Sequence, residues 1–147
     1  MPSRGMMTLA SLALAVALVA LPAGCGSASN VPTTVQGLVQ FQGYPLVGGL
    51  IVFTPDADRG GRGQPARADV QPDGSFQLQI EGSRQIPPGW YRVAIADPPT
   101  LPGRQPIHTG FPSRLRRPDR SDLLRQVQAG KDNHFEFLIE ALNSAEH

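Results

Sequence analysis

The side chains that most often carry out chemistry are few in this chain and far apart. Its three histidines, His108, His134 and His147, have no metal-binding spacing such as His-Glu-x-x-His. The sequence has no Gly-x-Ser-x-Gly nucleophile motif, and its one cysteine, Cys25, stands near the N-terminus. We therefore expect no catalytic residue, no metal site and no cofactor, and we predict that the protein is not an enzyme.

Two aspartates, Asp56 and Asp58, begin a partial calcium-binding loop. They occupy positions one and three, and Gly61 occupies position six, as in an EF-hand. Position five is Gly60 and position twelve is Arg67, however, where the motif supplies oxygen ligands. Because two carboxylates alone hold a hydrated cation weakly, we expect a glycine-rich solvent loop here.

Arginines gather in a long, proline-rich stretch, residues 97–122. Arg114, Arg116 and Arg117 lie closest together, and guanidinium groups match the geometry of phosphate and carboxylate anions. Two aspartates lie among them, and a single aromatic residue in the stretch offers a surface for base stacking. These features favour an ordinary solvated loop, keep contact with an anionic envelope surface as an alternative, and argue against nucleic-acid binding.

Trp90 and Tyr91 directly follow a Pro-Gly turn. An indole ring can stack on a sugar, so the pair makes carbohydrate binding a candidate function. A single tryptophan after a turn also fits a packing role at the end of a β domain, and we favour that role. Ligand contact by Trp90 and Tyr91 is kept as the alternative.

Cys25 follows a short apolar segment. Arg4 supplies one positive charge, and residues 6–21 carry none. A membrane-spanning helix needs about 20 predominantly apolar residues, so this run is short for a permanent span. A charged start, a short apolar run and small residues before a cleavage point are typical of an export signal, and we expect the segment to be removed.

The residues before Cys25 resemble the lipobox of bacterial lipoproteins, in which Ala-Gly precedes a cysteine that is acylated and becomes the new N-terminus. Ala23 and Gly24 match that pattern. The resemblance implies a signal peptide over residues 1–24 and attachment to a membrane through lipid, such as palmitate, on Cys25. Gly26 stands where an aspartate would retain the product in the inner membrane, so we expect the outer membrane, facing the periplasm. Ordinary secretion, with cleavage beyond the cysteine, and an uncleaved anchor are the alternatives.

Removing 24 of 147 residues leaves 123, the size of one domain. Loss of Arg4 also leaves 12 basic against 12 acidic residues, so the formal net charge falls from +1 to zero. A neutral chain gives no reason to expect a polyanionic partner. Without a second cysteine no internal disulfide can form, and the sequence does not set the oligomeric state.

Residues 25–33 are small and polar, as in a flexible tether, and we assign residues 34–141 to the folded domain and 142–147 to a tail. Short segments with β-branched and aromatic residues, most of them alternating apolar with polar, fill this domain. Seven of them are predicted to be strands: residues 35–41, 50–54, 66–70, 76–80, 90–96, 123–127 and 135–139.

Two local patterns are more specific. Residues 50–54 are an almost unbroken apolar run, which predicts a strand that is covered on both faces. Pro72-Asp73-Gly74 joins two alternating segments and predicts a hairpin, because proline presets one turn torsion and glycine accepts a positive φ. A helix over residues 115–128 is the one competing pattern, and Pro118 leads us to prefer a loop followed by a strand.

The order of several motifs resembles the carboxypeptidase regulatory-like domains, which are transthyretin-like sandwiches. The matching segments are Val35-Gln36-Gly37, Gly49 to Pro55, Pro72-Asp73-Gly74-Ser75-Phe76, Pro88-Gly89-Trp90-Tyr91-Arg92-Val93 and Val127 to Phe135. The strand pattern and this resemblance together predict an all-β, seven-stranded antiparallel Greek-key sandwich of transthyretin or immunoglobulin type.

What the resemblance implies for function is a non-catalytic accessory or binding fold. We therefore expect a lipid-anchored envelope protein that acts as a binding or structural module, with an envelope protein or a glycan as its partner. A carbohydrate-binding module of the starch-binding-like sandwich type is the alternative.

Overall fold

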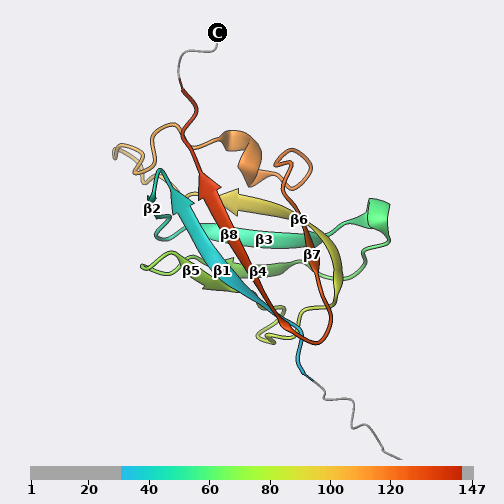
Figure 1. The fold of residues 1–147 in the computed structure, drawn as a ribbon. Helices are drawn as coiled ribbons and strands as arrows, with labels where there is room; N and C mark the ends of the chain where they lie inside the picture. The colour runs from blue at the N-terminus through green and yellow to red at the C-terminus, as the bar shows by residue number, and fades with distance from the viewer. Residues whose placement is uncertain (1–30, 144–147) are drawn as a thin grey trace, which may run out of the picture.

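Strands form where apolar residues recur at every second position, because such residues share one face of an extended chain. The structure is a computed structural model that describes residues 31–143. Eight strands and two short 3-10 helices follow one another along this part of the chain. The strands form two sheets that stack on each other (Figure 1).

The first sheet is built around β1 (Thr34–Phe41). β5 (Ser75–Gln77) and the two-residue β2 (Tyr44–Pro45) pair with one edge of β1, both antiparallel. β8 (Asp132–Ile139) pairs with the other edge along its whole length, and in parallel. The first sheet therefore has β8 as one of its edges.

The second sheet has the strand order β4, β3, β6, β7, and every pairing in it is antiparallel. Its strands are β3 (Leu50–Pro55), β4 (Ala66–Asp69), β6 (Gly89–Ala96) and β7 (Leu124–Val127). Two 3-10 helices lie in the connections: η1 (Ala57–Arg59) follows β3, and η2 (Ser113–Arg116) lies between β6 and β7.

The core lies between the sheets and is apolar. Phe53 of β3 is fully buried at its centre, and its ring lies 6.0 Å from that of Tyr91, 5.8 Å from Phe135 and 6.3 Å from Phe137. Phe111 and Leu115, from the connection between β6 and β7, are buried in the same core. This long connection is thus fixed to the sandwich by two apolar side chains.

The predicted all-β sandwich is confirmed. Each of the seven predicted segments contains a strand, and the two-residue β2 is an eighth that the sequence pattern did not indicate. The preference for a loop and a strand over a helix in residues 115–128 is also confirmed, since η2 makes only one turn and β7 follows it. The Greek-key connection stays a prediction.

One expected pairing direction is wrong. The sandwich was predicted to be antiparallel, but β1 and β8 run in parallel, with Thr34 opposite Asp132 and Phe41 opposite Ile139. The turn between β7 and β8 carries the chain from the second sheet to the first. β8 therefore enters beside the start of β1, where the N–H of Thr34 donates to the carbonyl oxygen of Lys131 at 3.2 Å, and continues in the same direction.

The prediction that residues 50–54 are covered on both faces is also wrong. Ile51 and Phe53 are fully buried, but Val52 is only partly buried and Leu50 is 37% exposed. Within residues 31–143 no second layer covers the outer face of this strand, so alternate residues reach solvent even though they are apolar.

The predicted hairpin is correct in its turn, and its two arms pair with each other only in part. The N–H of Gly74 donates to the carbonyl oxygen of Gln71 at 2.8 Å, and Gly74 has a φ of 85°. However, β4 pairs with β3 and β5 pairs with β1, so the two arms belong to different sheets. The arms are hydrogen-bonded to each other where the N–H of Gln71 donates to the carbonyl oxygen of Ser75 at 2.8 Å and at an antiparallel bridge between Arg67 and Gln79, and the turn acts as a corner between the sheets.

Candidate functional site

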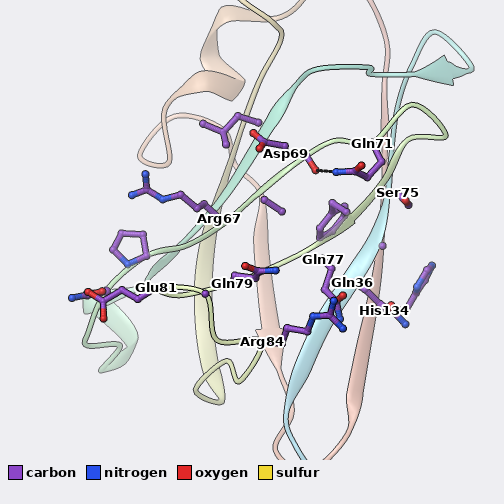
Figure 2. Close-up of a pocket in the computed structure, with 17 residues that line it drawn as sticks. Gln36, Arg67, Asp69, Gln71, Ser75, Gln77, Gln79, Glu81, Arg84 and His134 are labelled. Carbon is purple, nitrogen blue, oxygen red and sulfur yellow. Dashed lines mark hydrogen bonds between the residues drawn. The ribbon is translucent and has the colours of Figure 1, made fainter.

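A large concave surface extends from β4 across β5 to β1 and β8 (Figure 2). It has a volume of about 1060 Å³ and is lined mainly by polar side chains. Five glutamines define what we call the glutamine face: Gln36, Gln64, Gln71, Gln77 and Gln79.

The period of two in the strands explains why these side chains point outward. β5 and the residues after it bury Phe76 and Leu78, so Gln77 and Gln79 must project to the opposite side. β1 likewise buries Val35, and the next residue, Gln36, is only partly buried on the outer face. The polar half of the alternating pattern thus supplies a continuous surface.

Several of these amides are not engaged by the protein itself. Gln36 donates from Nε2 to the carboxylate of Asp132, and Gln71 makes one long contact of 3.5 Å to the carbonyl oxygen of Asp69. Within residues 31–143, the side chains of Gln64, Gln77 and Gln79 make no hydrogen bond to the protein. Each amide therefore presents two N–H donors and a carbonyl acceptor to solvent or to a ligand.

Four charged residues border the glutamine face, namely Arg67, Asp69, Glu81 and Arg84. In the described part of the chain none of them forms an ion pair. Two positive and two negative charges balance each other, so the surface has charged hydrogen-bonding groups without a net charge. This combination suits a polar ligand better than it suits a polyanion.

The arginines of the long connection have carboxylate partners. The pairs are Arg114 with Asp122 at 3.7 Å, Arg116 with Asp97 at 2.6 Å and Arg117 with Asp119 at 3.2 Å. Arg116 also lies over the ring of Phe111 at 5.5 Å. None of the three arginines lines the glutamine face, and their charges are offset by aspartates of the same connection between β6 and β7.

Trp90 and Tyr91 do not form a common platform, because neighbouring residues of a strand point to opposite faces. Tyr91 is 2% exposed, its hydroxyl donates to the carbonyl oxygen of Pro87 at 2.6 Å, and burial raises the pKa of this phenol. Trp90 is partly buried on the other side of β6, with the guanidinium of Arg59 5.6 Å above its ring. Tyr91 is thus the packing residue of the pair.

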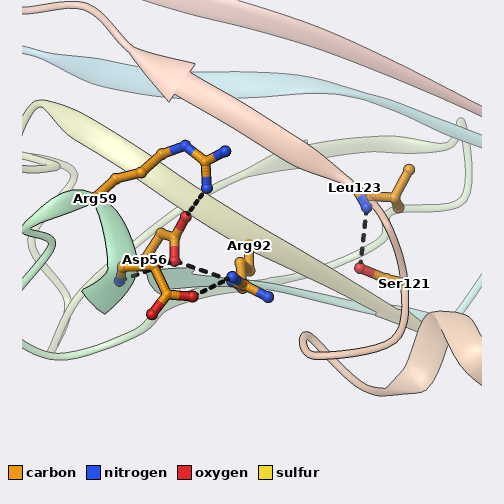
Figure 3. Close-up of polar contacts among 6 residues, drawn as sticks. Asp56, Arg59, Arg92, Ser121 and Leu123 are labelled. Carbon is orange, nitrogen blue, oxygen red and sulfur yellow. Dashed lines mark hydrogen bonds and ion pairs between the residues drawn. The ribbon is translucent and has the colours of Figure 1, made fainter.

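Asp56 is a buried ion-pair centre rather than part of a cation loop (Figure 3). Arg59 donates from Nη1 to its Oδ2 at 2.6 Å, and Arg92 donates from Nε to its Oδ1 at 3.0 Å. The carboxylate of Asp58 accepts from Nη2 of Arg92 at 2.7 Å. The hydrogen bond from Arg92, followed by that from Arg59, holds the pKa of Asp56 below its ordinary value of 3.8.

Of the two histidines in the described residues, His134 has its Nε2 3.7 Å from Oε1 of Glu136, and neither histidine belongs to a metal-binding cluster. His134 is exposed, as predicted, whereas the ring of His108 lies 5.5 Å from that of Phe41 and its Nε2 is buried without a hydrogen-bond partner. Among residues 31–143 no three or more side chains of the metal-binding types come together. Cys25 and His147 lie outside the described residues.

Sequence reasoning missed the glutamine face and three buried polar residues. Thr33 accepts from the N–H of Gly130, Ser121 donates to the carbonyl oxygen of Val93, and Asn133 accepts from the N–H of Gln128. The glutamines occupy the polar positions of the alternating strand pattern, and that pattern by itself indicates only a face that is exposed to solvent. The buried polar residues gave no local signal, since their partners lie far away or in turns.

No helix within residues 31–143 is long and apolar enough to cross a membrane. Comparisons with protein-family models, with curated proteins and with solved structures give no match for this chain. Its function is therefore argued from the glutamine face and from the sequence around Cys25.

Proposed function

We propose that the protein is a non-catalytic binding module, held by lipid on Cys25 at the periplasmic side of the outer membrane, that binds a hydroxyl-rich envelope ligand on its glutamine face. The observation that carries this proposal is the concave surface of about 1060 Å³ with unengaged side-chain amides. A carbohydrate is the ligand class that we favour, on the chemistry of those amides.

Sugar hydroxyls both donate and accept hydrogen bonds, and so do side-chain amides. Gln77 and Gln79 project from the same side of one extended segment, so they can contact hydroxyls along a single chain of sugar rings. Phe76 is 3% exposed, so the surface offers edge-on polar contacts rather than an aromatic platform. The ligand is thus recognised through hydrogen bonds, and the binding is expected to be weak for each sugar unit.

The balanced charge of the glutamine face makes some classes of ligand more suitable than others. Arg67 and Arg84 are offset by Asp69 and Glu81, which favours a neutral or zwitterionic glycan over a highly charged one. A phosphate-rich polymer would be attracted by the two arginines and repelled by the two carboxylates. Neutral oligosaccharides are therefore the first probes to use.

The way the chain enters the domain is compatible with anchoring. Val31 leads into β1 at one end of the sandwich, while the connection between β6 and β7 and the residues after β8 lie at the other end (Figure 1). An anchor before Val31 would leave the glutamine face, which lies along the side of the sandwich, open to envelope ligands.

The ligand proposal is tested by titration calorimetry with a panel of neutral oligosaccharides and peptidoglycan glycan fragments. We expect binding by the natural chain and a loss of about five- to fiftyfold in affinity when Gln77 and Gln79 are both replaced by Ala, at about one hydrogen bond each. Gln126→Ala is the matched control, because Gln126 is exposed on β7, outside the glutamine face. Equal affinity for both variants would place the ligand elsewhere.

The anchor is tested separately. Palmitate labelling of cells that express the chain is expected to be lost in Cys25→Ala, with the protein then recovered in the soluble periplasmic fraction. Labelling that persists in this variant, or a natural chain that is already soluble, contradicts the anchor and leaves the ligand proposal standing.

A further inference from the structure

β8 has one paired edge and one free edge. The N–H of Thr34 donates to the carbonyl oxygen of Lys131, and that of Gln42 donates to Ile139 at 2.8 Å. In a parallel ladder the N–H and C=O of one residue point to the same side. The odd-numbered residues of β8 therefore face β1, and the even-numbered ones face away from it.

The outward-facing backbone groups have no partner in the described residues. The N–H and C=O groups of His134, Glu136 and Leu138 form no backbone hydrogen bond there. An edge of this length is a template for another strand, and β8 contains neither proline nor lysine, two residues that commonly block such pairing. β8 is thus open to extension of the sheet.

Space is available along this free edge. A groove of about 420 Å³ separates β8 from the segment that contains η2 and β7, with Leu115 and Leu123 on one side and Phe137 and Leu138 on the other. The guanidinium of Arg125 lies 4.8 Å from the ring centre of Phe137 and covers the core beneath the groove. A strand can therefore approach the edge without exposing the core.

We propose that β8 pairs antiparallel with β8 of a second copy of this chain, with His134 opposite Glu136 of that copy. This arrangement has two-fold symmetry, so the same contact is made twice. Within one chain, Nε2 of His134 lies 3.7 Å from Oε1 of Glu136, and both side chains stay exposed, at 57% and 60%, so each can also contact its counterpart in a second copy. Both residues have outward-facing backbone groups. The free edge is therefore complementary to itself.

Repulsion between like charges favours this register over the two registers that are shifted by two residues. A shift of two residues in one direction places Glu136 opposite Glu136 of the second copy, and a like-charged pair across strands is destabilising. The same shift in the other direction places Glu136 opposite Asp132. In the proposed register the partly buried Phe135 faces Phe135 of the second copy on the two-fold axis, where an aromatic pair adds contact.

The second copy also extends the candidate ligand surface. His134 lines the glutamine face at its β8 border. Pairing through β8 brings Glu136 of the second copy beside it and joins the two glutamine faces on one continuous sheet. The dimer itself does not depend on any ligand, so this inference stands apart from the proposed function.

The experiment is sedimentation velocity on the full chain, purified in detergent, for the natural protein and for the variants His134→Glu and Glu136→Lys. The natural chain is expected to dimerise. His134→Glu places two carboxylates opposite each other twice, and Glu136→Lys replaces the carboxylate partner of His134 with a cation, so each variant alone is expected to dimerise roughly tenfold more weakly. In an equal mixture the introduced lysine lies opposite the introduced glutamate, and His134 lies opposite Glu136 as in the natural pair, so dimers should reappear.

Disulfide trapping checks the register independently. An equal mixture of His134→Cys and Glu136→Cys is expected to form a crosslinked dimer on mild oxidation, because opposed strand residues lie within disulfide reach. Glu136→Cys alone is expected to crosslink far less, since its two thiols are then out of register. Circular dichroism on every variant verifies that it is folded.

Three results overturn the proposal. A natural chain that stays monomeric at every concentration leaves the edge free or assigns it to another protein. Dimers that the charge changes do not weaken lie on a different surface. A variant mixture that does not recover dimers rules out the pairing of His134 with Glu136.

Discussion

Arg92 on β6 donates from Nε to Oδ1 of Asp56 at 3.0 Å, although the two residues are 36 positions apart in the sequence. Asp56 is 1% exposed and also accepts from Arg59 and from the N–H of Asp58. The pair fixes the loop that follows β3 to the middle of the second sheet. These hydrogen bonds hold the short acidic loop in one conformation at a corner of the fold.

The first prediction concerns the pH dependence of stability. The pKa of Asp56 is lowered by folding, so this carboxylate stabilises the fold fully at neutral pH, and that contribution is lost as the pH falls below about 4. Asp56→Asn is expected to be less stable than the natural chain at pH 7, with a difference that shrinks between about pH 5 and pH 3. Urea unfolding across this pH range measures it.

Asp58→Asn is the matched control for this experiment, because Asp58 is 79% exposed and contacts only Arg92 with its carboxylate. Its replacement is expected to have a much smaller effect on the urea midpoint. A stability difference for Asp56→Asn that is constant from pH 7 to pH 3 would show that charge is not the cause.

The strands were predictable from the sequence, and their partners were not. The period of two depends only on neighbouring residues, which is why Val35, Val39 and Phe41 identified the buried face of β1. The parallel pairing of β1 with β8 joins residues nearly one hundred positions apart, and no local spacing encodes it. The ion pair of Asp56 with Arg92 was unpredictable for the same reason.

The candidate site was less predictable than the fold. Gln77 and Gln79 have the same spacing whether they face solvent or line a concave surface, because curvature comes from how β4 and β5 turn between the sheets. Trp90 stood out by its residue type, but its neighbour Tyr91 occupies the core. Residue type identified side chains that are able to bind a ligand, but only the packing of the strands determines where those side chains lie.

The second prediction concerns Gly37 of β1, which is paired with Phe135 of β8 on one side and with Phe76 of β5 on the other. A Cβ atom at this position would be 1.8 Å from the carbonyl oxygen of Phe135 and 2.9 Å from the ring of Phe76. Gly37→Ala is therefore expected to destabilise the fold by about 3 kcal/mol or more, the upper end for overpacking. Thermal and urea unfolding measure the loss.

Gly43→Ala is the control for this prediction. Gly43 has a φ of 80° in a turn with no atom within 4 Å of the added Cβ, so only backbone strain of about 1 kcal/mol is expected. Equal losses for the two variants would mean that the close approach to Phe135 is relieved by a small shift of β8.

The third prediction concerns Ser121, which is 1% exposed and holds the end of the long connection (Figure 3). Its Oγ donates to the carbonyl oxygen of Val93 at 2.5 Å and accepts from the N–H of Leu123 at 3.2 Å. Ser121→Ala leaves two backbone groups without that partner and is expected to cost about 1–3 kcal/mol of stability. Ser113→Ala, at an exposed position of η2, is expected to stay within about 0.5 kcal/mol.

Hydrogen exchange adds a second readout for Ser121. Faster exchange over residues 112–124 in Ser121→Ala, with unchanged exchange in β1 and β8, would locate the effect in the connection. Uniform acceleration throughout the domain would instead indicate that Ser121 supports the whole sandwich.

The fourth prediction concerns the arginines of the connection. The ion pairs of Arg116 with Asp97 and of Arg117 with Asp119 involve arginine side chains that are 45% and 57% exposed. Asp119 is also exposed, so Arg117→Ser is expected to change the unfolding free energy by less than about 1 kcal/mol. Asp97 is only 9% exposed, so Arg116→Ser leaves a shielded carboxylate without its guanidinium partner and is expected to cost about 1–3 kcal/mol. Equal, small losses for the two variants would show that the shielding of Asp97 adds nothing to its ion pair.

The fifth prediction separates the glutamine face from the tryptophan. Trp90 is the single tryptophan of the chain and lies on β6, in the second sheet, beneath the guanidinium of Arg59. A ligand on the first sheet and β4 does not touch it, so a saturating oligosaccharide is expected to leave its fluorescence unchanged. Trp90→Phe is expected to keep the affinity within about twofold, whereas the Gln77 and Gln79 double replacement weakens it by the loss of two hydrogen bonds. Quenching by the sugar, together with a loss of affinity in Trp90→Phe, would move the carbohydrate site to β6 and remove the glutamine face from the function.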